Sequence, residues 1–491
     1  MSRPERGRVD VGVGVVVVGG GVAGATAALA ISRHGLPVTL IDEQPQAGGQ
    51  IYRAPTPYAR RHVPPNHEFS GGDRLRALLA ASSVRTRFST RVWGAWGASP
   101  GMELDLLGPD GIDRIGARAL VVANGATERF LPFPGWTDPR VIGLAGASIL
   151  MRNGGTLPGR RVVVAGAGPL LFSVAHQVME LGGRVVAVID SGRRGDWLRL
   201  AATLAWDPAR LRLAAQWMTR LRLAGIPIHH QARIAAIHPA EDGLSITIAG
   251  TIAGTVAGTA RQGPAVRHYG ADAVACGHGL KPATLLTRTL GARHRFDAAG
   301  GYWEPETDPS GRTSRTGLYA TGDAAGIRGA AVARLRGLIT GHAVALDQGA
   351  IAERDFASLT RRPRMLLRRQ EHVSRRMLPL LNASASLSRD IADDAIVCRC
   401  ERVEAAALRA AVAAGARDLN QLKAWTRCGM GPCQGRMCED GARGLLAASC
   451  GLPPEEAGSF TPRMPFFPLP LAALTGTFAY SDIPLPKAAP L

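Results

Sequence analysis

Four cysteines near the carboxyl end of the chain have a spacing suited to metal binding: Cys398 and Cys400 in VCRC, and Cys433 and Cys438 in GMGPCQGRMC. Of the seven cysteines, only Cys276 precedes this region. Disulfides that hold a fold together are spread along a chain, whereas clustered thiols in a long chain without a clear export signal favour metal or redox chemistry in a reducing compartment. The pattern therefore predicts a metal site.

Iron and zinc are the two metals that this thiol pattern could bind. Thiolates at positions i and i+2 of an extended segment face the same side, so Cys398 and Cys400 could reach one iron while Cys433 and Cys438 hold a second. Structural zinc also takes four thiolates, but its common spacing is C-x(2–4)-C rather than C-x-C. The spacing favours an iron-sulfur centre and keeps zinc as the alternative.

The stretch between the two cysteine pairs, EAAALRAAVAAGARDLNQLKAW, is rich in alanine and leucine. It predicts two short helices interrupted at Gly415, because glycine ends helices readily and both halves consist of good helix formers. Such a helical hairpin would bring the distant cysteines together.

Residues 396–440, and TRCGMGPCQGRMC in particular, resemble the [2Fe-2S] domain of the bacterioferritin-associated-ferredoxin (BFD) type, found at the end of certain flavin dehydrogenase subunits. In that pattern the position of Cys428 need not be cysteine, so the resemblance leaves this residue out. The ligands that it implies are Cys398, Cys400, Cys433 and Cys438.

The amino-terminal region has a dinucleotide-binding pattern in VGVGVVVVGGGVAGATAALAISRHGLPVTLID. Gly19 permits a tight turn, Gly21 lets the backbone approach a pyrophosphate, and Gly24 allows the following helix to pack closely on the strand, with its N-terminal N–H groups facing the phosphates. Asp42 ends the second strand, where an acidic residue binds ribose hydroxyls, and Glu43 is the alternate. The pattern predicts a Rossmann-type unit.

A membrane span or a signal peptide is an alternative interpretation of this region, because residues 11–31 are uncharged and follow an arginine-containing start. The glycines at motif spacing, followed directly by a polar turn and a strand, favour a buried parallel strand with its phosphate loop instead.

Three later segments indicate FAD rather than NAD as the nucleotide. They are QAGGQIYR with Gly49 and Gln50, ALVVANGATERFLPFPGW with Gly125, and GLYATGDAAGI with Gly322 and Asp323. All three resemble flavoproteins of the glutathione-reductase type, which implies that Asp323 binds the ribityl or pyrophosphate part of FAD. A helix N-cap is the alternative role for Asp323, and the two roles can coexist.

A second nucleotide-type unit, RVVVAGAGPLLFSVAHQVMELGGRVVAVID, has an incomplete fingerprint. Gly166 and Gly168 are present, but Leu171 occupies the third glycine position, where a side chain hinders close packing of helix on strand. Asp190 ends the next strand and suits a ribose 2'-hydroxyl. The sequence predicts the fold of a pyridine-nucleotide domain and leaves NAD(P) binding open.

Disulfide-reductase chemistry is excluded, because it needs two close thiols beside the flavin and only Cys276 precedes residue 398. We expect Cys276 to be a buried packing residue. His278 and Lys281, close by in the same segment, could contact a cofactor or an anion, but a solvated loop is the expectation.

The order of GGQIYR, ATERFLPFPGW, CGHGLKPAT and the cysteine region resembles the larger flavin subunit of heteromeric amine and amino-acid dehydrogenases. This group includes opine oxidases, hydrogen cyanide synthase, dye-linked proline and hydroxyproline dehydrogenases, and the related sarcosine oxidase large subunit. The resemblance implies an FAD and [2Fe-2S] subunit that relays electrons from oxidation of an amine or amino acid of the proline, hydroxyproline, opine, glycine or sarcosine type.

The expected partner is a flavoprotein subunit resembling D-amino-acid oxidase, and a small ferredoxin-like third subunit is a further expectation. No catalytic residue is predicted, because the substrate flavin can lie on that partner. Two other functions stay open: an NAD(P)H-dependent flavin and iron-sulfur reductase, and a non-catalytic subunit whose cluster region serves partner binding.

The composition limits the remaining possibilities. The net charge of +19 comes almost wholly from arginine, since lysine occurs only at positions 281, 423 and 487. Aromatic residues are 5% of the chain and no nucleic-acid-binding module is visible, so a nucleic-acid partner is not expected. We expect a cytoplasmic protein without a transmembrane span, with peripheral association at the inner membrane through the electron acceptor as the alternative.

The predicted fold class is α/β, a glutathione-reductase-like flavoprotein with two dinucleotide-binding domains and a small helical BFD-like domain. The proline-broken, apolar end cannot form a core alone and is expected to lie on another domain or on a partner. The expected domains are 1–136 (FAD-binding, first part), 137–284 (inserted NAD(P)-binding-like), 285–350 (FAD-binding, second part), 351–394 (basic helical linker), 395–452 (BFD-like) and 453–491 (docking tail).

Overall fold

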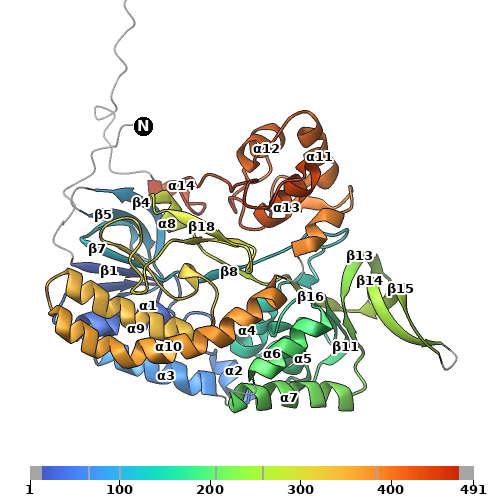
Figure 1. The fold of residues 1–491 in the computed structure, drawn as a ribbon, viewed down its shortest axis with the longest axis horizontal. Coiled ribbons are helices and arrows are strands. Elements are labelled where there is room, and N and C mark those ends of the chain that lie inside the picture. The colour runs from blue at the N-terminus through green and yellow to red at the C-terminus, as the bar shows by residue number, and fades with distance from the viewer. Residues whose placement is uncertain are drawn as a thin grey trace, which may run out of the picture.

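The computed structural model describes residues 14–64, 67–98, 101–204, 207–256, 259–382 and 385–474. Two α/β units lie next to each other, a helical module that contains the clustered cysteines lies above them, and the long helix α10 runs across both units (Figure 1). The predicted two-nucleotide-fold architecture is confirmed. Residues 1–13 of the expected FAD domain and 475–491 of the expected tail lie outside the described residues.

The first unit is built on a parallel sheet of short apolar strands. Its central strand β1 is VVVV, and all four valines are buried, as expected for a strand covered on both faces. In the register of this sheet Val17 pairs with Leu40 on one side and with Val121 on the other. The strand order is β20 (Leu318–Ala320), β7 (Ala119–Val122), β1 (Val15–Val18), β2 (Val38–Ile41) and β3 (Arg85–Arg87).

Two helices pack very closely on this sheet. Helix α1 (Val22–Ser32) is apolar on almost every side, because it is covered by the sheet on one face and by α9 (Ala330–Asp347) on another. A Cβ at Gly337 of α9 would lie 2.2 Å from the carbonyl oxygen of Ala23, and one at Gly341 would lie 2.7 Å from that of Ala27. Glycines in α9 therefore allow this approach.

The second unit repeats the arrangement. Its parallel sheet has the order β12 (Ile228–His230), β11 (Arg184–Asp190), β10 (Arg161–Gly166), β16 (Ala273–Gly277) and β9 (Val141–Ile142). The helices beside it are α4 (Leu144–Gly154), α5 (Leu170–Glu180), α6 (Arg194–Leu204) and α7 (Pro208–Leu223).

Smaller antiparallel elements join and flank the two units. The meander β4–β6 belongs to the first unit, and β13–β15 extends from the second, where β14 and β15 pair as an antiparallel hairpin. The strands are β4 (Arg91–Gly97), β5 (Met102–Gly108), β6 (Gly111–Ala117), β8 (Ala126–Glu128), β13 (Ala232–Ala240), β14 (Gly243–Val256), β15 (Thr259–Ala271), β17 (Leu280–Pro282), β18 (His294–Asp297) and β19 (Tyr302–Pro305). The remaining helices of this part are α2 (Pro57–His62), α3 (His67–Ala80) and α8 (Leu285–Thr289).

The basic segment that follows α9, expected as a helical linker, forms α10 (Glu353–Leu381). This helix also packs on other parts of the protein. Leu367 joins an apolar cluster with residues of α9, and Val373 and Leu380 join another with Leu200 and Leu204 of α6. The helix thereby packs on both units, while many of its arginines remain exposed.

The cysteine module, residues 391–460, has its own apolar core. The two helices predicted around Gly415 are confirmed as α11 (Ala405–Ala413) and α12 (Leu419–Thr426), and Gly415 between them has a φ of +122°. The other elements of this end of the chain are β21 (Ile396–Cys398), β22 (Val403–Glu404), α13 (Glu439–Cys450) and α14 (Leu471–Leu474).

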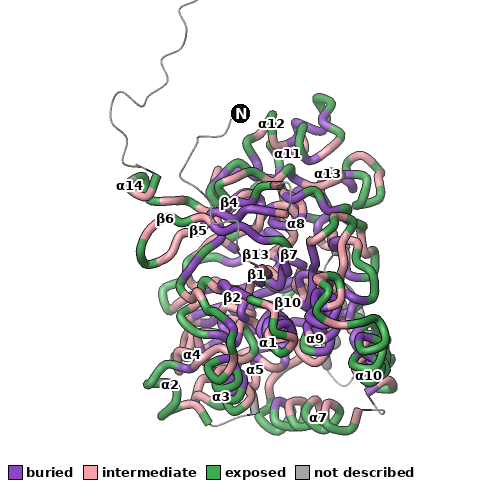
Figure 2. Tube along the Cα trace, turned by 90° about the vertical axis from the view of Figure 1, so that its left-hand side faces the viewer, coloured by how far each residue is buried: buried purple, intermediate pink, exposed green. Residues whose placement is uncertain are grey.

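Burial is concentrated on the strands and central helices, and α2, α7 and the outer side of α10 form the exposed rim (Figure 2). Within the described part of the chain, none of the helices combines the length and the apolar character that crossing a membrane requires.

Candidate functional site

The loop between β1 and α1 has the geometry of a phosphate-binding turn. Gly19 has a φ of +107°, and a Cβ there would lie 2.3 Å from the carbonyl oxygen of Ala123, so only glycine fits. A Cβ at Gly24 would lie 1.9 Å from the carbonyl oxygen of Gly19, whereas one at Gly21 would meet only Gly49 Cα, at 3.7 Å. No side chain caps the N-terminus of α1. Its N–H groups and partial positive charge therefore suit a pyrophosphate.

The two acidic residues at the end of β2 have different environments. Asp42 accepts hydrogen bonds from the backbone N–H groups of Gly20 (2.5 Å) and Gln44 (2.7 Å), and its burial raises the pKa of its carboxyl group. Glu43 instead forms an ion pair with Arg91, at 3.3 Å, near the surface. Asp42 is therefore held beside the phosphate loop, while Glu43 is directed away from it.

The segment that follows β2 lies against the same loop. Gly48 pairs with Gly21 in an isolated β-bridge, and Gly49 has a φ of +59°. Gln50 is exposed, and its Oε1 accepts a hydrogen bond from Arg53, at 3.0 Å. Gly49 thus belongs to the floor of the candidate flavin site and Gln50 to its edge.

The segment with Gly322 and Asp323, called here the second flavin turn, follows the edge strand β20 and lies against the start of α1. A Cβ at Gly322 would lie 2.6 Å from the Cβ of Ala23, in the first turn of α1. Asp323 is partly buried, and the desolvation of its carboxyl group raises its pKa. Its Oδ1 accepts hydrogen bonds from the N–H groups of Arg328 (3.1 Å) and Gly329 (3.3 Å). Asp323 therefore organises the turn before α9, but the helix N-cap role is wrong: the N-cap residue of the short 3-10 helix Gly322–Ala325 is Thr321, and that of α9 is Gly329.

The turn after β7 contains the remaining predicted position, Gly125. It has a φ of +73°, and its carbonyl oxygen accepts a hydrogen bond from the N–H of Ala283, at 3.0 Å. This turn joins the first unit to the strand pair β8–β17, through which the chain enters and leaves the second unit.

The second unit holds its expected ribose-binding acid in a protein network. Asp190 is fully buried; its Oδ2 lies 2.6 Å from the indole Nε1 of Trp197 and 2.7 Å from Nδ1 of His230, and its Oδ1 accepts a hydrogen bond from Gly192 N at 2.8 Å. Leu171 is also fully buried and packs in the core of this unit. The carboxylate that was expected to bind a ribose hydroxyl is therefore hydrogen-bonded to side chains of α6 and β12 instead.

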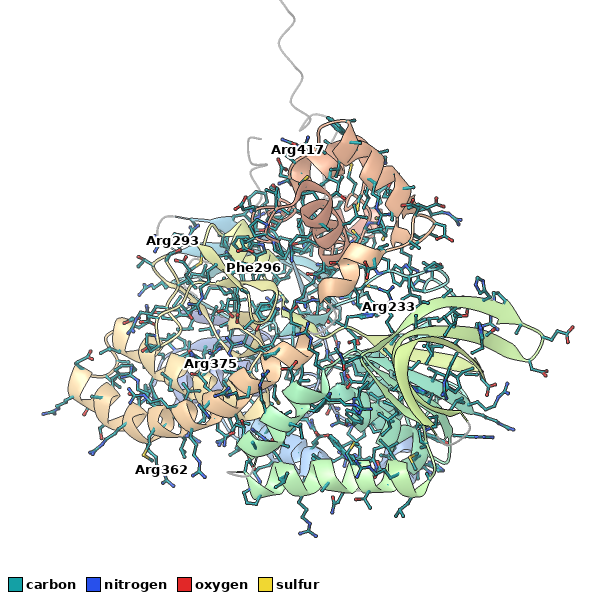
Figure 3. The ribbon with its side chains drawn as sticks, turned by 45° about the vertical axis from the view of Figure 1, so that its right-hand side comes forward. Arg233, Arg293, Phe296, Arg362, Arg375 and Arg417 are labelled. Carbon is teal, nitrogen blue, oxygen red and sulfur yellow. The ribbon has the colours of Figure 1, made fainter. Side chains whose placement is uncertain are left out.

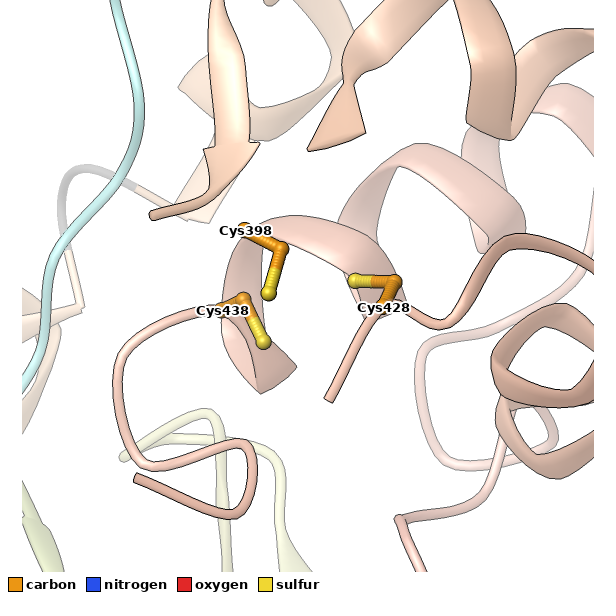
Figure 4. Close-up of side chains that lie close together, drawn as sticks. All are labelled: Cys398, Cys428 and Cys438. Atoms are coloured by element: carbon orange, nitrogen blue, oxygen red, sulfur yellow. The ribbon is translucent and has the colours of Figure 1, made fainter. Parts of the chain in front are cut away.

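The clustered cysteines form two groups. Cys398, Cys428 and Cys438 are buried, and their sulfur atoms all lie within 4.8 Å of one another (Figure 4). Cys400 and Cys433 are closer to the surface, and the sulfur of Cys400 hydrogen-bonds with the backbone and the thiol of Cys433. All seven cysteines of the chain are free thiols. The fold thus adds Cys428 to the four cysteines that the sequence singled out.

The three buried sulfurs need a positive charge to ionise together. Hydrogen bonds from the thiols of Cys428 and Cys438 lower the pKa of Cys398, and the same contacts with Cys398 raise the pKa of both neighbours. Like charges this close destabilise one another, so only one thiolate is favoured without a cation. This set of donors fits a metal centre.

The local backbone explains the approach of the outer pair. Strand β21 ends at Cys398, and residues 399–402 form a turn, so the extended C-x-C segment that the sequence predicts is wrong. Cys400 instead approaches the second cysteine segment at Gly431, where a Cβ would lie 2.2 Å from the Cβ of Cys400.

Phe460, which the sequence did not single out, covers the cysteine loop. A Cβ at Gly429 or Gly435 would lie 2.8 or 2.5 Å from its ring, and both glycines have positive φ. The glycines of GMGPCQG are therefore the signal in the sequence for a bulky neighbour.

A buried ion network docks the cysteine module on the flavin-binding unit. Asp440, two residues after Cys438, is hydrogen-bonded to Lys281 at 2.5 Å and to Arg443 at 3.1 Å, and it lies 3.8 Å from Arg129. Burial alone would raise the pKa of Asp440, but these three cations together hold it below its usual value. The expectation that Lys281 lies in a solvated loop is wrong.

His278 likewise lies inside the protein rather than in a solvated loop. Its ring is buried, which lowers its pKa to about 4, and its Nδ1 accepts a hydrogen bond from the N–H of Leu131, at 3.2 Å. Cys276 is buried, as expected.

Two further contacts attach the module and its tail. The indole of Trp136 donates to the carbonyl oxygen of Ile396 at 2.6 Å, two residues before Cys398 in the chain. In the tail, Phe466 donates its N–H to the carbonyl oxygen of Trp93 in β4, at 2.8 Å, and accepts a hydrogen bond from Arg436 of the cysteine loop, at 3.0 Å. The module is therefore attached at two places: through Trp136, which packs in a core of the second unit, and through the tail, which contacts β4 of the first.

Replacing Asp440 with asparagine should loosen this docking. Asp440→Asn leaves Lys281 and Arg129 buried without a counter-charge, and loss of one partner from a buried ion network costs about 3–5 kcal/mol. We expect a loss of this order in the free energy of unfolding measured with urea, together with faster proteolysis before residue 395. The control is Glu456→Gln, at an exposed position of the same module, which should change neither quantity. An Asp440→Asn protein as stable as the control would show that the network contributes nothing to docking.

Comparison with known proteins agrees with this architecture. Residues 13–349 match the pyridine nucleotide-disulphide oxidoreductase family, and residues 393–477 match the sarcosine oxidase A3 domain. An opine oxidase subunit of Rhizobium meliloti (strain 1021) is 34% identical over 93% of this chain and 97% of its own length. A hydrogen cyanide synthase subunit of Pseudomonas aeruginosa is 31% identical over 93% and 97%. The alpha subunit of sarcosine oxidase from a Corynebacterium (strain P-1) is 26% identical over 95% and 46%.

Solved structures share the fold. The L-proline dehydrogenase of P. horikoshii superposes with a TM-score of 0.64 at 20% identity, over 94% of this chain and 79% of that one. The thioredoxin reductase of T. acidophilum gives a TM-score of 0.50 at 19% identity, over 68% and 98%. The resemblance inferred from the sequence motifs is confirmed, and the chain belongs to the pyridine nucleotide-disulphide oxidoreductase family, as a flavin-dependent oxidoreductase related to the opine oxidase, hydrogen cyanide synthase and sarcosine oxidase subunits.

Proposed function

We propose that this chain is the FAD and [2Fe-2S] subunit of a heteromeric dehydrogenase that oxidises an amine or amino acid of the proline, hydroxyproline, opine, glycine or sarcosine type. The observation that supports it most directly is that one chain contains a flavin-type fold and a module with six cysteines, joined by a buried ion network. A flavin accepts a hydride, whereas an iron-sulfur cluster accepts electrons one at a time, so a fixed spacing between the two suits a relay.

For FAD we propose roles that follow the geometry of the first unit. The turn with Gly19, Gly21 and Gly24 and the uncapped N-terminus of α1 would hold the pyrophosphate. Asp42 would accept from ribose hydroxyls, and Glu43 is the less favoured alternate because it forms a surface ion pair with Arg91. The positions proposed to line the rest of the cofactor are Gly49, Gln50, Gly125, Gly322 and Asp323.

For the cluster we propose the ligands Cys398, Cys400, Cys433 and Cys438. Cys398 lies beside Cys438 and Cys400 beside Cys433, so these two pairs would hold the irons, in place of the Cys398–Cys400 and Cys433–Cys438 pairs expected from an extended segment. Cys428 would remain a fifth thiol beside the cluster. Phe460, which lies on the loop glycines, would keep water away from it.

An NAD(P)H-dependent reductase is less well supported by the second unit. Both carboxylate oxygens of Asp190 are engaged by protein donors, and Trp197 lies beside the place where a ribose would bind. A nucleotide would have to break these buried hydrogen bonds, each worth about 1–3 kcal/mol when a charged group is involved.

Addition of NADH or NADPH should therefore leave the flavin oxidised. We expect no bleaching of its visible absorbance in the anaerobic holoprotein, while dithionite bleaches it completely as the positive control. Rapid bleaching by either nicotinamide would favour the reductase function and contradict the relay.

Turnover should depend on a partner subunit. The purified chain alone should reduce an artificial dye poorly with any amino acid, and co-expression with a neighbouring subunit resembling D-amino-acid oxidase should restore the activity at least about tenfold, in a screen over proline, hydroxyproline, glycine, sarcosine and opines. If the complex turned over while its cluster stayed oxidised under all substrates, the cluster module would serve partner binding alone.

Single cysteine variants distinguish the ligand sets. Cys433→Ser should lose the visible and paramagnetic cluster signals and most of the iron and sulfide, whereas Cys428→Ser should keep them. Cys450→Ser, outside both groups, is the matched control and should behave as the unchanged protein. The opposite result, with Cys428 required and Cys433 dispensable, would assign the metal to the buried trio of Cys398, Cys428 and Cys438.

A further inference from the structure

A cavity of about 720 Å³ lies outside both candidate cofactor sites. Its walls come from α9, α10, the 307–312 loop and the end of β20. Arg336 and Thr340 of α9 line it, whereas Gly337 and Gly341 of the same helix face α1 and the phosphate loop. The cavity is thus separated from the candidate flavin site by α9, and its volume is in the range of small-molecule pockets, about 300–1,000 Å³.

Three residues that line this cavity each have one buried polar atom without a hydrogen-bond partner among the described residues: Oγ1 of Thr321, Oε2 of Glu304 and Nε of Arg364. Oε2 of Glu304 lies 3.8 Å from the guanidinium group of Arg328. Thr321 is 1% exposed and Glu304 2% exposed. Buried polar groups are almost always hydrogen-bonded, so three of them on one cavity indicate an occupant with both donors and acceptors.

Most of the carboxylates around the cavity are already neutralised by arginines. Glu371 forms an ion pair with Arg336 at 2.7 Å, and Asp308 forms one with Arg312 at 3.1 Å. Glu304 pairs through its Oε1 with Arg295, also at 2.7 Å. The remaining carboxylate, that of Glu353, is exposed at the first turn of α10.

Two arginines one helical turn apart on α10 remain without a carboxylate partner among the described side chains. Arg364 donates to the hydroxyl of Ser310 at 3.0 Å and lies over the ring of Phe356, with 5.1 Å between its Cζ and the ring centroid. Arg368 lines the same cavity from an exposed position. A guanidinium group with unused donors in this setting suits an oxyanion.

We propose that this cavity binds a hydroxylated organic anion, in which a phosphate or carboxylate group contacts Arg364 and Arg368 and a hydroxyl group donates to Glu304. Thr321 supplies a further hydrogen bond. Sugar phosphates and hydroxycarboxylates share this chemistry. Thr321 directly precedes Gly322 and Asp323, so an occupant would contact the segment that forms the second flavin turn.

Calorimetric titration of the holoprotein tests the site with three probes: citrate, ribose 5-phosphate and inorganic phosphate. We expect citrate or ribose 5-phosphate to bind more tightly than inorganic phosphate, because phosphate alone cannot use Glu304 and Thr321 as well. The probe that binds best distinguishes a carboxylate from a phosphate ligand. Absence of heat from all three probes at millimolar concentration would overturn the proposal.

Variants of α10 locate the binding. Arg368→Gln, at an exposed position that should not affect folding, is expected to weaken the best probe about 10- to 100-fold, as loss of a charged hydrogen bond does. The matched control is Arg362→Gln, an exposed arginine of the same helix that points away from the protein (Figure 3) and should leave binding unchanged. Equal weakening by both variants would indicate attraction by the net charge of α10 and contradict a defined site. Thr321→Val should weaken citrate or ribose 5-phosphate more than inorganic phosphate.

Discussion

The contact on which the proposed relay depends is the buried ion network at Asp440. Desolvating one carboxylate and three cations is expensive, and an apolar patch of similar size would attach the cysteine module at least as strongly. The network instead determines the orientation of the module. Lys281 and Arg129 belong to the segments that connect the two nucleotide-type units, and Asp440 follows Cys438 by two residues. The cysteine loop is thereby fixed in orientation to the part of the fold that would hold the flavin.

Close backbone packing is the second constraint, and it is the part of the fold that the sequence predicted best. Gly19 and Gly24 are required by contacts within one strand-turn-helix unit, so their spacing alone identifies the turn. The incomplete glycine pattern of the second unit predicted its fold correctly. It could not show that Asp190 is hydrogen-bonded within the protein, because the partners Trp197 and His230 belong to elements whose placement depends on the whole unit. Lys281 was misassigned for the same reason, since Asp440 lies 159 residues further along the chain.

The cysteine region shows where spacing stops being informative. A motif indicates which thiols are available, but it does not determine which sulfurs a folded loop brings together. The chain turns after Cys398 instead of continuing as a strand, and helix α12 ends just before Cys428, which places that thiol in the buried trio. The glycines at 429 and 435 could have indicated that a bulky side chain packs on the loop. The nearby sequence does not identify that side chain as Phe460, because Phe460 follows α13 in the chain.

Helix α10 relates these features to one another. Its buried face packs on α9, which adjoins the candidate flavin site, and then on α6, whose Trp197 donates a hydrogen bond to Asp190 of the second unit. The second unit thus has the fold of a nucleotide-binding domain, while its Asp190 carboxylate is hydrogen-bonded within the protein. In the proposed function this unit would serve as a scaffold for the connecting segments. With nicotinamide disfavoured there, electrons would have to enter through the flavin or the cluster. Both would be held by elements that the Asp440 network joins, so in the proposed function the same buried charges that position the module would also define the route.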